Sequence, residues 1–409
     1  MRYQELFPVP TEWVQDVDEA MAETVARWAE QEVMAKRLEH REDYEKLLLP
    51  AMSKLFLNIG LQAMLWPEEA GGGGLSSPSA AMTVTAMLEQ AGRADTGIAF
   101  LLANTFALQS TFGIEPHRNE ALLGELAPLF SEGGEVSVGA LVLPDYGNGS
   151  GGERPSFSGL DYQVTAWRKD GRWVLKGEQV RPQCSGATAG IFGVVFALDD
   201  GTPAVGLVPS GVTGLSAGEP FKKTGLAASV NADLVFKDVE SYVVMTGPDG
   251  VKEMLCWYYM GCSAACVGAL FASHEILKEW GETRVIKGKG HIFKDNPLVA
   301  ALMGQIGSRI AVNRILTYNL ARMLSGPDLY GPAGSQAIYA TATAIFQQVS
   351  RSAMQSIDNS MELMASAGYA TEWNLERYWR DVKTIETYVI PETVAQTGMA
   401  EHYFGSQIV

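Results

Sequence analysis

Cysteine is scarce in this sequence, and its spacing does not suit a covalent or metal-bound scaffold. There are 4 cysteines in 409 residues, and no two of them form a C-x-x-C pair. A disulfide framework or a zinc site is therefore not expected. Three of the cysteines fall in one apolar segment, CWYYMGCSAACVG, which is typical of small residues buried in a helix. We expect no bound metal ion.

Basic residues are also few. Asp and Glu number 47 against 31 for Lys and Arg, which gives a formal net charge of −16. Such a field repels nucleic acid and anionic membrane surfaces, so small ligands and proteins are the expected partners. The first residues, MRYQELFPVPTEW, lack a basic stretch followed by an apolar one. We see no apolar run of the about 18 residues that span a bilayer, and we expect a cytoplasmic protein without membrane insertion.

Hydrophobic periodicity divides the chain into three regions. From residue 14 to 131, apolar residues recur at three- and four-residue spacing, which predicts helices. From residue 134 to 244, short alternating apolar runs stand between Gly, Asp, Asn and Pro turns, which predicts an antiparallel sheet. Long helical patterns return from residue 250 onwards. The predicted class is α+β, with three domains at residues 1–133, 134–245 and 246–409.

Four local sequences, in order along the chain, resemble motifs of the acyl-CoA dehydrogenase superfamily. WPEEAGGGGLS (66–76) is similar to the family's "PEEYGGxGLS" loop, and DYQVTAWRKDGRWVLKGEQ (161–179) to its "DGYVLNGxK" hairpin. KKTGLAASVNADLVFKDVE (222–240) resembles "MGxRxSxTxxLxFxDV", and GYATEWNLERYWRDVKT (368–384) resembles "GYTxEyPvERxyRDaK". One such match is weak evidence, but four in the right order are specific.

The resemblance implies a fold, a reaction and partners. The fold has an N-terminal helical domain, a middle antiparallel β domain and a C-terminal four-helix bundle, and it is usually assembled as a tetramer. The reaction is α,β-dehydrogenation of an acyl-CoA thioester: a carboxylate removes the α-proton while the β-hydride leaves to the flavin of FAD. Electron-transferring flavoprotein is the expected acceptor.

The catalytic glutamate that the resemblance predicts is absent. After the "RDaK" motif, most members continue "IyxIYEGT", with the glutamate as the base. Here Tyr388 matches the tyrosine and is a candidate for substrate binding. Val389 occupies the position of the base. Other members place the base on the first helix of the C-terminal domain, where CWYYMGCSAACVG has no acid and Tyr259 replaces a substrate-binding arginine.

The residues at cofactor and substrate positions have changed as well. By resemblance, Val142 replaces a threonine that binds the flavin, and Arg181 replaces a tryptophan packed near the flavin. Gln183 replaces the threonine that faces flavin N5. Asn148 occupies the position where the family has a serine in the substrate-binding loop. At the site for the diphosphate of a neighbouring subunit's FAD, the candidates are Arg284, Glu362 and Ser366.

One acid remains as a candidate base. Asp95, in EQAGRADTGIAF, opens the helix that lines the acyl pocket in this fold, and some alicyclic acyl-CoA dehydrogenases resembling this chain use an aspartate in that region. Asp followed by Thr-Gly-Ile-Ala is also a good helix start, so an N-cap role is the competing interpretation. Arg181 has two interpretations too: it holds a substrate carboxylate, or it belongs to a structural ion pair.

Three functions are compatible with these residues. The first is a flavoprotein that acts on an unusual acyl-CoA, cyclic or dicarboxylic, with Asp95 as base. The second is a base-free acyl-CoA decarboxylase or lyase. The third is a non-catalytic structural subunit of a heteromer, paired with a paralogue that carries the glutamate. A homotetramer suits the first function and a heterotetramer suits the third.

Overall fold

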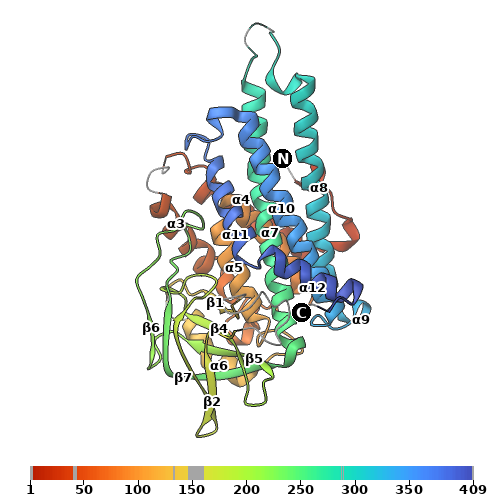
Figure 1. The fold of residues 1–409 in the computed structure, drawn as a ribbon. Coiled ribbons are helices and arrows are strands. Elements are labelled where there is room, and N and C mark those ends of the chain that lie inside the picture. The colour runs from red at the N-terminus through yellow and green to blue at the C-terminus, as the bar shows by residue number, and fades with distance from the viewer. Residues whose placement is uncertain are drawn as a thin grey trace.

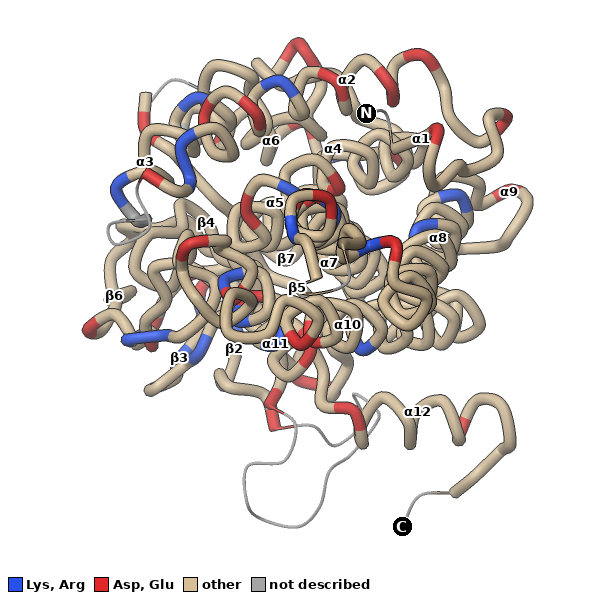
Figure 2. The backbone as a smooth tube through the Cα atoms, turned by 90° about the horizontal axis from the view of Figure 1, so that it is seen from above, with Lys and Arg blue, Asp and Glu red and all other residues tan. Residues whose placement is uncertain are grey.

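The computed structural model describes residues 3–39, 44–131, 134–145, 161–286, 288 and 290–407. An N-terminal helical region comes first, then a sheet, then a bundle of long helices, in the expected order (Figure 1). The N-terminal helices are α1 (Tyr3–Leu6), α2 (Asp16–Trp28), α3 (Tyr44–Ser53), α4 (Ala80–Ala94), α5 (Thr96–Gln109) and α6 (Glu120–Ser131). Acidic residues lie along α2 and on several other helices (Figure 2), in line with the negative net charge.

The middle region is a bent seven-stranded sheet of mixed direction. Its strands are β1 (Gly139–Val142), β2 (Thr165–Lys169), β3 (Arg172–Val180), β4 (Ile191–Ala197), β5 (Pro203–Pro209), β6 (Leu215–Ala217) and β7 (Leu234–Thr246). The spatial order is β1-β4-β5-β7-β3-β2, with β6 also paired to β7. All pairs are antiparallel except β1 with β4, which are parallel because the chain leaves the sheet edge and returns in the same direction.

The β2–β3 hairpin shows how local sequence sets the register. Asp170 and Gly171 connect the strands, and both have positive φ, 51° and 81°. Two successive residues of positive φ match the right-handed twist of paired strands, which is why Asp-Gly is a favoured hairpin turn. The register then follows, with Lys169 opposite Arg172.

The C-terminal region is built from four long helices. They are α7 (Gly247–Thr283), α8 (Pro297–Ser325), α10 (Gln336–Met364) and α11 (Leu375–Tyr388), joined by the short α9 (Pro327–Tyr330) and followed by α12 (Glu392–Phe404). In Figure 1, α7, α8 and α10 run side by side along the long axis, and the sheet lies at one end of the bundle. This is the expected four-helix arrangement.

One expectation about apolar runs needs correction. Helix α7 contains an 18-residue window of mean hydropathy 1.5, which by length and composition is sufficient to cross a membrane. All of that window is buried inside the protein. Helices α4, α5, α10 and α11 pack around α7, so its uniform apolar surface is that of a central core helix.

Helices α4 and α7 cross with their backbones in direct contact. A Cβ atom added at Gly268 would overlap the carbonyl oxygen of Glu89, and one added at Gly92 would meet the carbonyl oxygen of Ala265. Glycine at both positions therefore allows an approach that no side chain would permit.

A buried ion pair joins the N-terminal helices to the bundle close to this crossing. Glu89 on α4 and Arg314 on α8 are 1% and 8% exposed, and Arg314 Nε lies 3.1 Å from Glu89 Oε1. The hydroxyl of Tyr318 donates to the same carboxylate at 3.2 Å. Removing one partner of such a pair leaves an uncompensated buried charge.

We predict that Glu89→Gln lowers the free energy of unfolding by about 3 kcal/mol, because Arg314 keeps its charge and loses its counter-ion. Chemical denaturation measures this loss. The control is Glu282→Gln, which removes a pair with Lys294 whose side chains are 42% and 39% exposed. A solvated pair of this kind contributes less than about 1 kcal/mol. Equal effects of the two substitutions would contradict the prediction.

Candidate active site

The residues at the predicted flavin and base positions meet where the loop between β3 and β4 faces the bundle. The hydroxyl of Tyr258 on α7 donates to Gln183 Oε1 at 3.1 Å. The hydroxyl of Tyr388, at the end of α11, donates to the carbonyl oxygen of Pro182 at 3.0 Å. Tyr388 and Tyr258 therefore contact neighbouring residues of the same loop, Pro182 and Gln183. We use the name cleft for this region, between loop 181–186, Tyr258 of α7 and the end of α11, because the resemblance places the flavin ring and the substrate there.

The position of the usual base holds a buried aliphatic residue. Val389 directly follows α11 and is 0% exposed, and Ile390 beside it is 2% exposed. The nearby acids are engaged elsewhere: Glu386 pairs with Lys383 at 2.8 Å, and Glu392 with Arg351. No carboxylate therefore replaces the missing base at the end of α11 among the residues that the structure describes.

On α7, the helix where the resemblance places the alternative base, the structure presents a phenol that the sequence reasoning missed. Tyr258 is 0% exposed, and burial raises the pKa of its hydroxyl well above the usual value. A phenol with a raised pKa stays protonated, so it serves as a hydrogen-bond donor and not as a base. Residues 258 and 259 differ by about 100° around a helix, and in a run of three aromatic residues the sequence does not say which one faces the cleft.

Tyr259 lies on a different face of α7. Its ring is 5.5 Å from that of Phe346 and 6.1 Å from that of Tyr339, both on α10. These contacts place Tyr259 in the aromatic core of the bundle. Asn148, the other candidate for substrate binding, lies outside the described residues.

Of the two roles considered for Arg181, the structure shows the ion pair. Its Nε and Nη2 atoms lie 2.8 and 3.0 Å from the two carboxylate oxygens of Asp233. The guanidinium also stacks over Phe221, 4.6 Å from the ring centre. A substrate carboxylate at Arg181 would therefore have to compete with Asp233.

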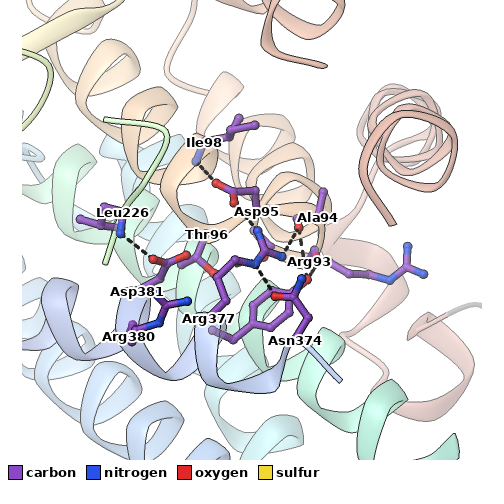
Figure 3. Close-up of polar contacts among 12 residues, drawn as sticks. Arg93, Ala94, Asp95, Thr96, Ile98, Leu226, Asn374, Arg377, Arg380 and Asp381 are labelled. Carbon is purple, nitrogen blue, oxygen red and sulfur yellow. Dashed lines mark hydrogen bonds and ion pairs between the residues drawn. The ribbon is translucent and has the colours of Figure 1, made fainter. Parts of the chain in front are cut away.

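Asp95 caps α5 and is bound to a buried arginine (Figure 3). Its Oδ1 accepts a hydrogen bond from the backbone N–H of Ile98 at 2.7 Å, which confirms the predicted N-cap. Its Oδ2 forms an ion pair with Arg377 of α11, and the two side chains are 1% and 5% exposed. Burial, together with the nearby Asp381 carboxylate, raises the pKa of Asp95 to about 8.

Arg377 and Asp381 extend this cluster to the other domains. Arg377 donates to Asn374 Oδ1 at 2.9 Å and to the carbonyl oxygen of Ala94 at 3.0 Å. Asp381 accepts from the backbone N–H of Leu226, in a loop of the middle domain. The charges around Asp95 therefore connect all three domains.

The candidates for the diphosphate lie far from the cleft. Arg284 directly follows α7 and stacks over Trp280, 5.1 Å from the ring centre. Glu362, near the end of α10, and Ser366, in the turn after it, are both exposed. Figure 1 places the ends of α7 and α10 at the opposite end of the bundle from the sheet. Within one chain the two sets of candidates do not contact one flavin.

Comparison with known proteins agrees with this architecture. The family model "Acyl-CoA dehydrogenase, N-terminal domain" matches residues 15–123, and "Acyl-CoA dehydrogenase, C-terminal domain" matches residues 246–389. The chain belongs to the acyl-CoA dehydrogenase family. Members of the family are oxidoreductases that act on CH–CH donors, and the family implies FAD and an acyl-CoA substrate.

Individual relatives are distant but match almost end to end. The short-chain specific acyl-CoA dehydrogenase of Mus musculus mitochondria is 25% identical, over 96% of this chain and 91% of its own length. Cyclohex-1-ene-1-carbonyl-CoA dehydrogenase of Geobacter metallireducens is 24% identical, over 84% and 87%. The structure of a glutaryl-CoA dehydrogenase from Mycobacterium smegmatis in complex with FADH2 has a TM-score of 0.76 at 18% identity, covering 97% of both chains.

The residues present fit FAD at one end and not at the other. In the cleft, the half-buried Gln183 offers an amide that can donate to a ring nitrogen or carbonyl oxygen. Val142 in β1 is 0% exposed, and its aliphatic side chain offers a ligand no hydrogen bond. At the far end, the exposed carboxylate of Glu362 would repel the diphosphate of a neighbour's FAD.

We predict that Asp95→Asn lowers the free energy of unfolding by about 1 to 3 kcal/mol at pH 9, above the Asp95 pKa of about 8, because the buried Arg377 then loses the carboxylate paired with it and keeps only the more distant Asp381. Asn still caps a helix, so the loss reports on the ion pair. The matched control is the double substitution Asp95→Asn/Arg377→Met, which removes both charges and restores most of the lost stability. Denaturant unfolding compares the variants. A double variant no more stable than the single one would contradict this account.

We also predict that two tyrosines of the cleft resist ionisation. Burial raises the pKa of Tyr388 to about 12 and that of Tyr258 further. Absorbance titration of the folded protein should therefore give the same tyrosinate signal for wild type, Tyr388→Phe and Tyr258→Phe up to about pH 11. Each raised pKa contributes stability that is present below about pH 10 and is lost as the pH rises through the folded value. A smaller signal in either variant near pH 10 would show that the phenol is accessible.

Proposed function

We propose that this chain is the subunit of a heteromeric acyl-CoA dehydrogenase that does not itself remove the α-proton. A paralogous subunit with the glutamate carries out that step. The observation behind the proposal is that neither base position offers a carboxylate: the end of α11 has the buried Val389, and α7 has the phenol of Tyr258, hydrogen-bonded to Gln183. Removal of an α-proton from a thioester needs a base within reach of it.

The contacts of Asp95 argue against it as a substitute base. One carboxylate oxygen caps α5 and the other is paired with Arg377. The side chain is 1% exposed, and its two carboxylate oxygens bind Ile98 and Arg377. Proton transfer at Asp95 would leave the arginine without its partner and would disturb the junction of the three domains.

The diphosphate end of the site supports a heteromer over a homomer. In a homomer, every FAD would meet Glu362 from a neighbouring copy, at an unfavourable electrostatic cost. A paralogue with a neutral or basic residue there removes that repulsion. The proposed assembly acts on a CoA thioester with a cyclic or dicarboxylic acyl group, since relatives include a cyclohexene-carbonyl-CoA dehydrogenase and a glutaryl-CoA dehydrogenase. Electron-transferring flavoprotein is its proposed acceptor.

A second candidate function keeps the chain catalytic on its own. In this alternative, Asp95 acts as base on a cyclic acyl-CoA, and the similarity to cyclohex-1-ene-1-carbonyl-CoA dehydrogenase favours it. The two candidates differ in their response to Asp95→Asn. Loss of turnover that the double variant Asp95→Asn/Arg377→Met does not restore would indicate a base, whereas loss that follows stability alone would indicate a structural residue.

The deciding experiment compares the chain expressed alone with the chain co-expressed with a base-bearing paralogue. Turnover is assayed with butyryl-CoA, cyclohex-1-ene-1-carbonyl-CoA and glutaryl-CoA. We expect no turnover by the chain alone, turnover by the co-purified assembly, and loss of that turnover when the paralogue's glutamate is replaced by glutamine. Val389→Ala in this chain should leave the turnover of the assembly unchanged. An active homomer of this chain would overturn the proposal.

A further inference from the structure

A cavity of about 440 Å³ lies between the N-terminal helices and the bundle, and the proposed function makes no use of it. Three parts of the chain form its walls: the start of α2, the loop that leads into α4, and the end of α8 together with α9. They contribute residues from the ranges 12–18, 74–83 and 322–330. A cavity of this volume is large enough for a small organic molecule.

Arg322 is the one basic residue among the described residues that line this cavity. Its guanidinium lies over the rings of Trp13 and Tyr330, 5.0 and 5.8 Å from the ring centres. Attraction to a ring orients a guanidinium but supplies no hydrogen-bond acceptor. Within the part of the chain that the structure describes, no carboxylate pairs with Arg322 and no atom accepts a hydrogen bond from it, whereas Arg314 on the same helix is paired with Glu89. The N–H donors of Arg322 are therefore available to a ligand.

The two acids that line the cavity limit the charge of that ligand. Asp18 is 3% exposed, and its two oxygens accept hydrogen bonds from the hydroxyl of Thr83 and the backbone N–H of Gln15. Glu12 is exposed at the start of the chain segment that precedes α2. Because both carry negative charge close to the ligand, a doubly charged phosphate meets more repulsion here than a singly charged carboxylate does.

The rest of the lining offers a further donor and an apolar surface. Ser77 Oγ and Ser79 Oγ are 2.6 Å apart, so one hydroxyl donates to the other and the second O–H is left for a ligand. Val17 and Leu329 also line the cavity, and they are 44% and 81% exposed. An apolar group placed in the cavity would remove these aliphatic side chains from water, which is favourable.

We propose that this cavity binds a small monocarboxylate with an apolar body, held at its carboxylate by Arg322 and by the hydroxyls of Ser77 and Ser79. A planar guanidinium matches a carboxylate through two parallel N–H···O bonds. The apolar body covers Val17 and Leu329. The proposal is independent of the proposed function, because no residue of the cleft lines this cavity.

The test is equilibrium dialysis of the purified full-length chain against radiolabelled octanoate. We expect a Kd below about 1 mM. Arg322→Met should weaken binding by about tenfold or more, because it removes the charged donors. Arg322→Lys keeps the charge without the planar fork and should give an intermediate affinity. Octan-1-ol, which has the same chain and no charge, should compete poorly.

Arg351→Met is the matched control. Arg351 is an exposed arginine of α10 that pairs with Glu392 outside the cavity, so its loss should leave octanoate binding unchanged. If Arg322→Met does not fold, the pair Ser77→Ala/Ser79→Ala tests the same site and should weaken binding severalfold.

Three results would overturn the inference. One is no binding of octanoate up to about 5 mM, far above the expected Kd. Another is equal affinity in wild type and folded Arg322→Met, which would place octanoate elsewhere in the protein. The third is tighter binding of octyl phosphate than of octanoate, which would exclude the carboxylate preference. None of these results depends on turnover, so they are distinct from failure of the proposed function.

Discussion

A buried arginine must keep a carboxylate beside it, and in this protein that requirement governs the region where the three domains meet. Arg377 is 5% exposed and Asp95 is its counter-ion. The same arginine holds the end of α4 through the carbonyl oxygen of Ala94, and Asp381, one turn further along α11, holds the loop at Leu226. An acid in this setting is part of the framework. Its presence in the sequence therefore says little about proton transfer.

The cleft keeps the contacts that hold its loop in place, but the reactive side chains differ from those that the family pattern predicts. Tyr388 still binds the loop at Pro182, and that loop still lies against α7 and β1. What has changed is the chemistry that the side chains offer: an aliphatic group where a base is expected, and a phenol and an amide that bind each other. Fold and family are therefore secure, while function has to be argued from the site.

Sequence reasoning succeeded where the signal was local. The domain order, the Asp-Gly hairpin and the N-cap at Asp95 all follow from short stretches of residues. Where distant segments decide the outcome, it left alternatives open or was wrong. The ion pair of Arg181 was one of two interpretations, because its partner Asp233 lies 52 positions away. The parallel pairing of β1 with β4 was not predicted, since it depends on the path of the chain between them. The direction in which Tyr258 points depends on how α7 is rotated about its own axis. That rotation is set by packing against the rest of the bundle.

The contact between α4 and α7 limits how far substitutions can change the shape of the bundle. Because Gly92 and Gly268 bring the two backbones together, any larger residue at either position would push the helices apart. The separation of these helices is therefore set by main-chain atoms, which side-chain substitutions elsewhere do not alter. Such a rigid crossing acts as a fixed reference for the elements packed around it. Replacements of side chains elsewhere in the bundle can therefore alter its chemistry while the distance between α4 and α7 stays the same.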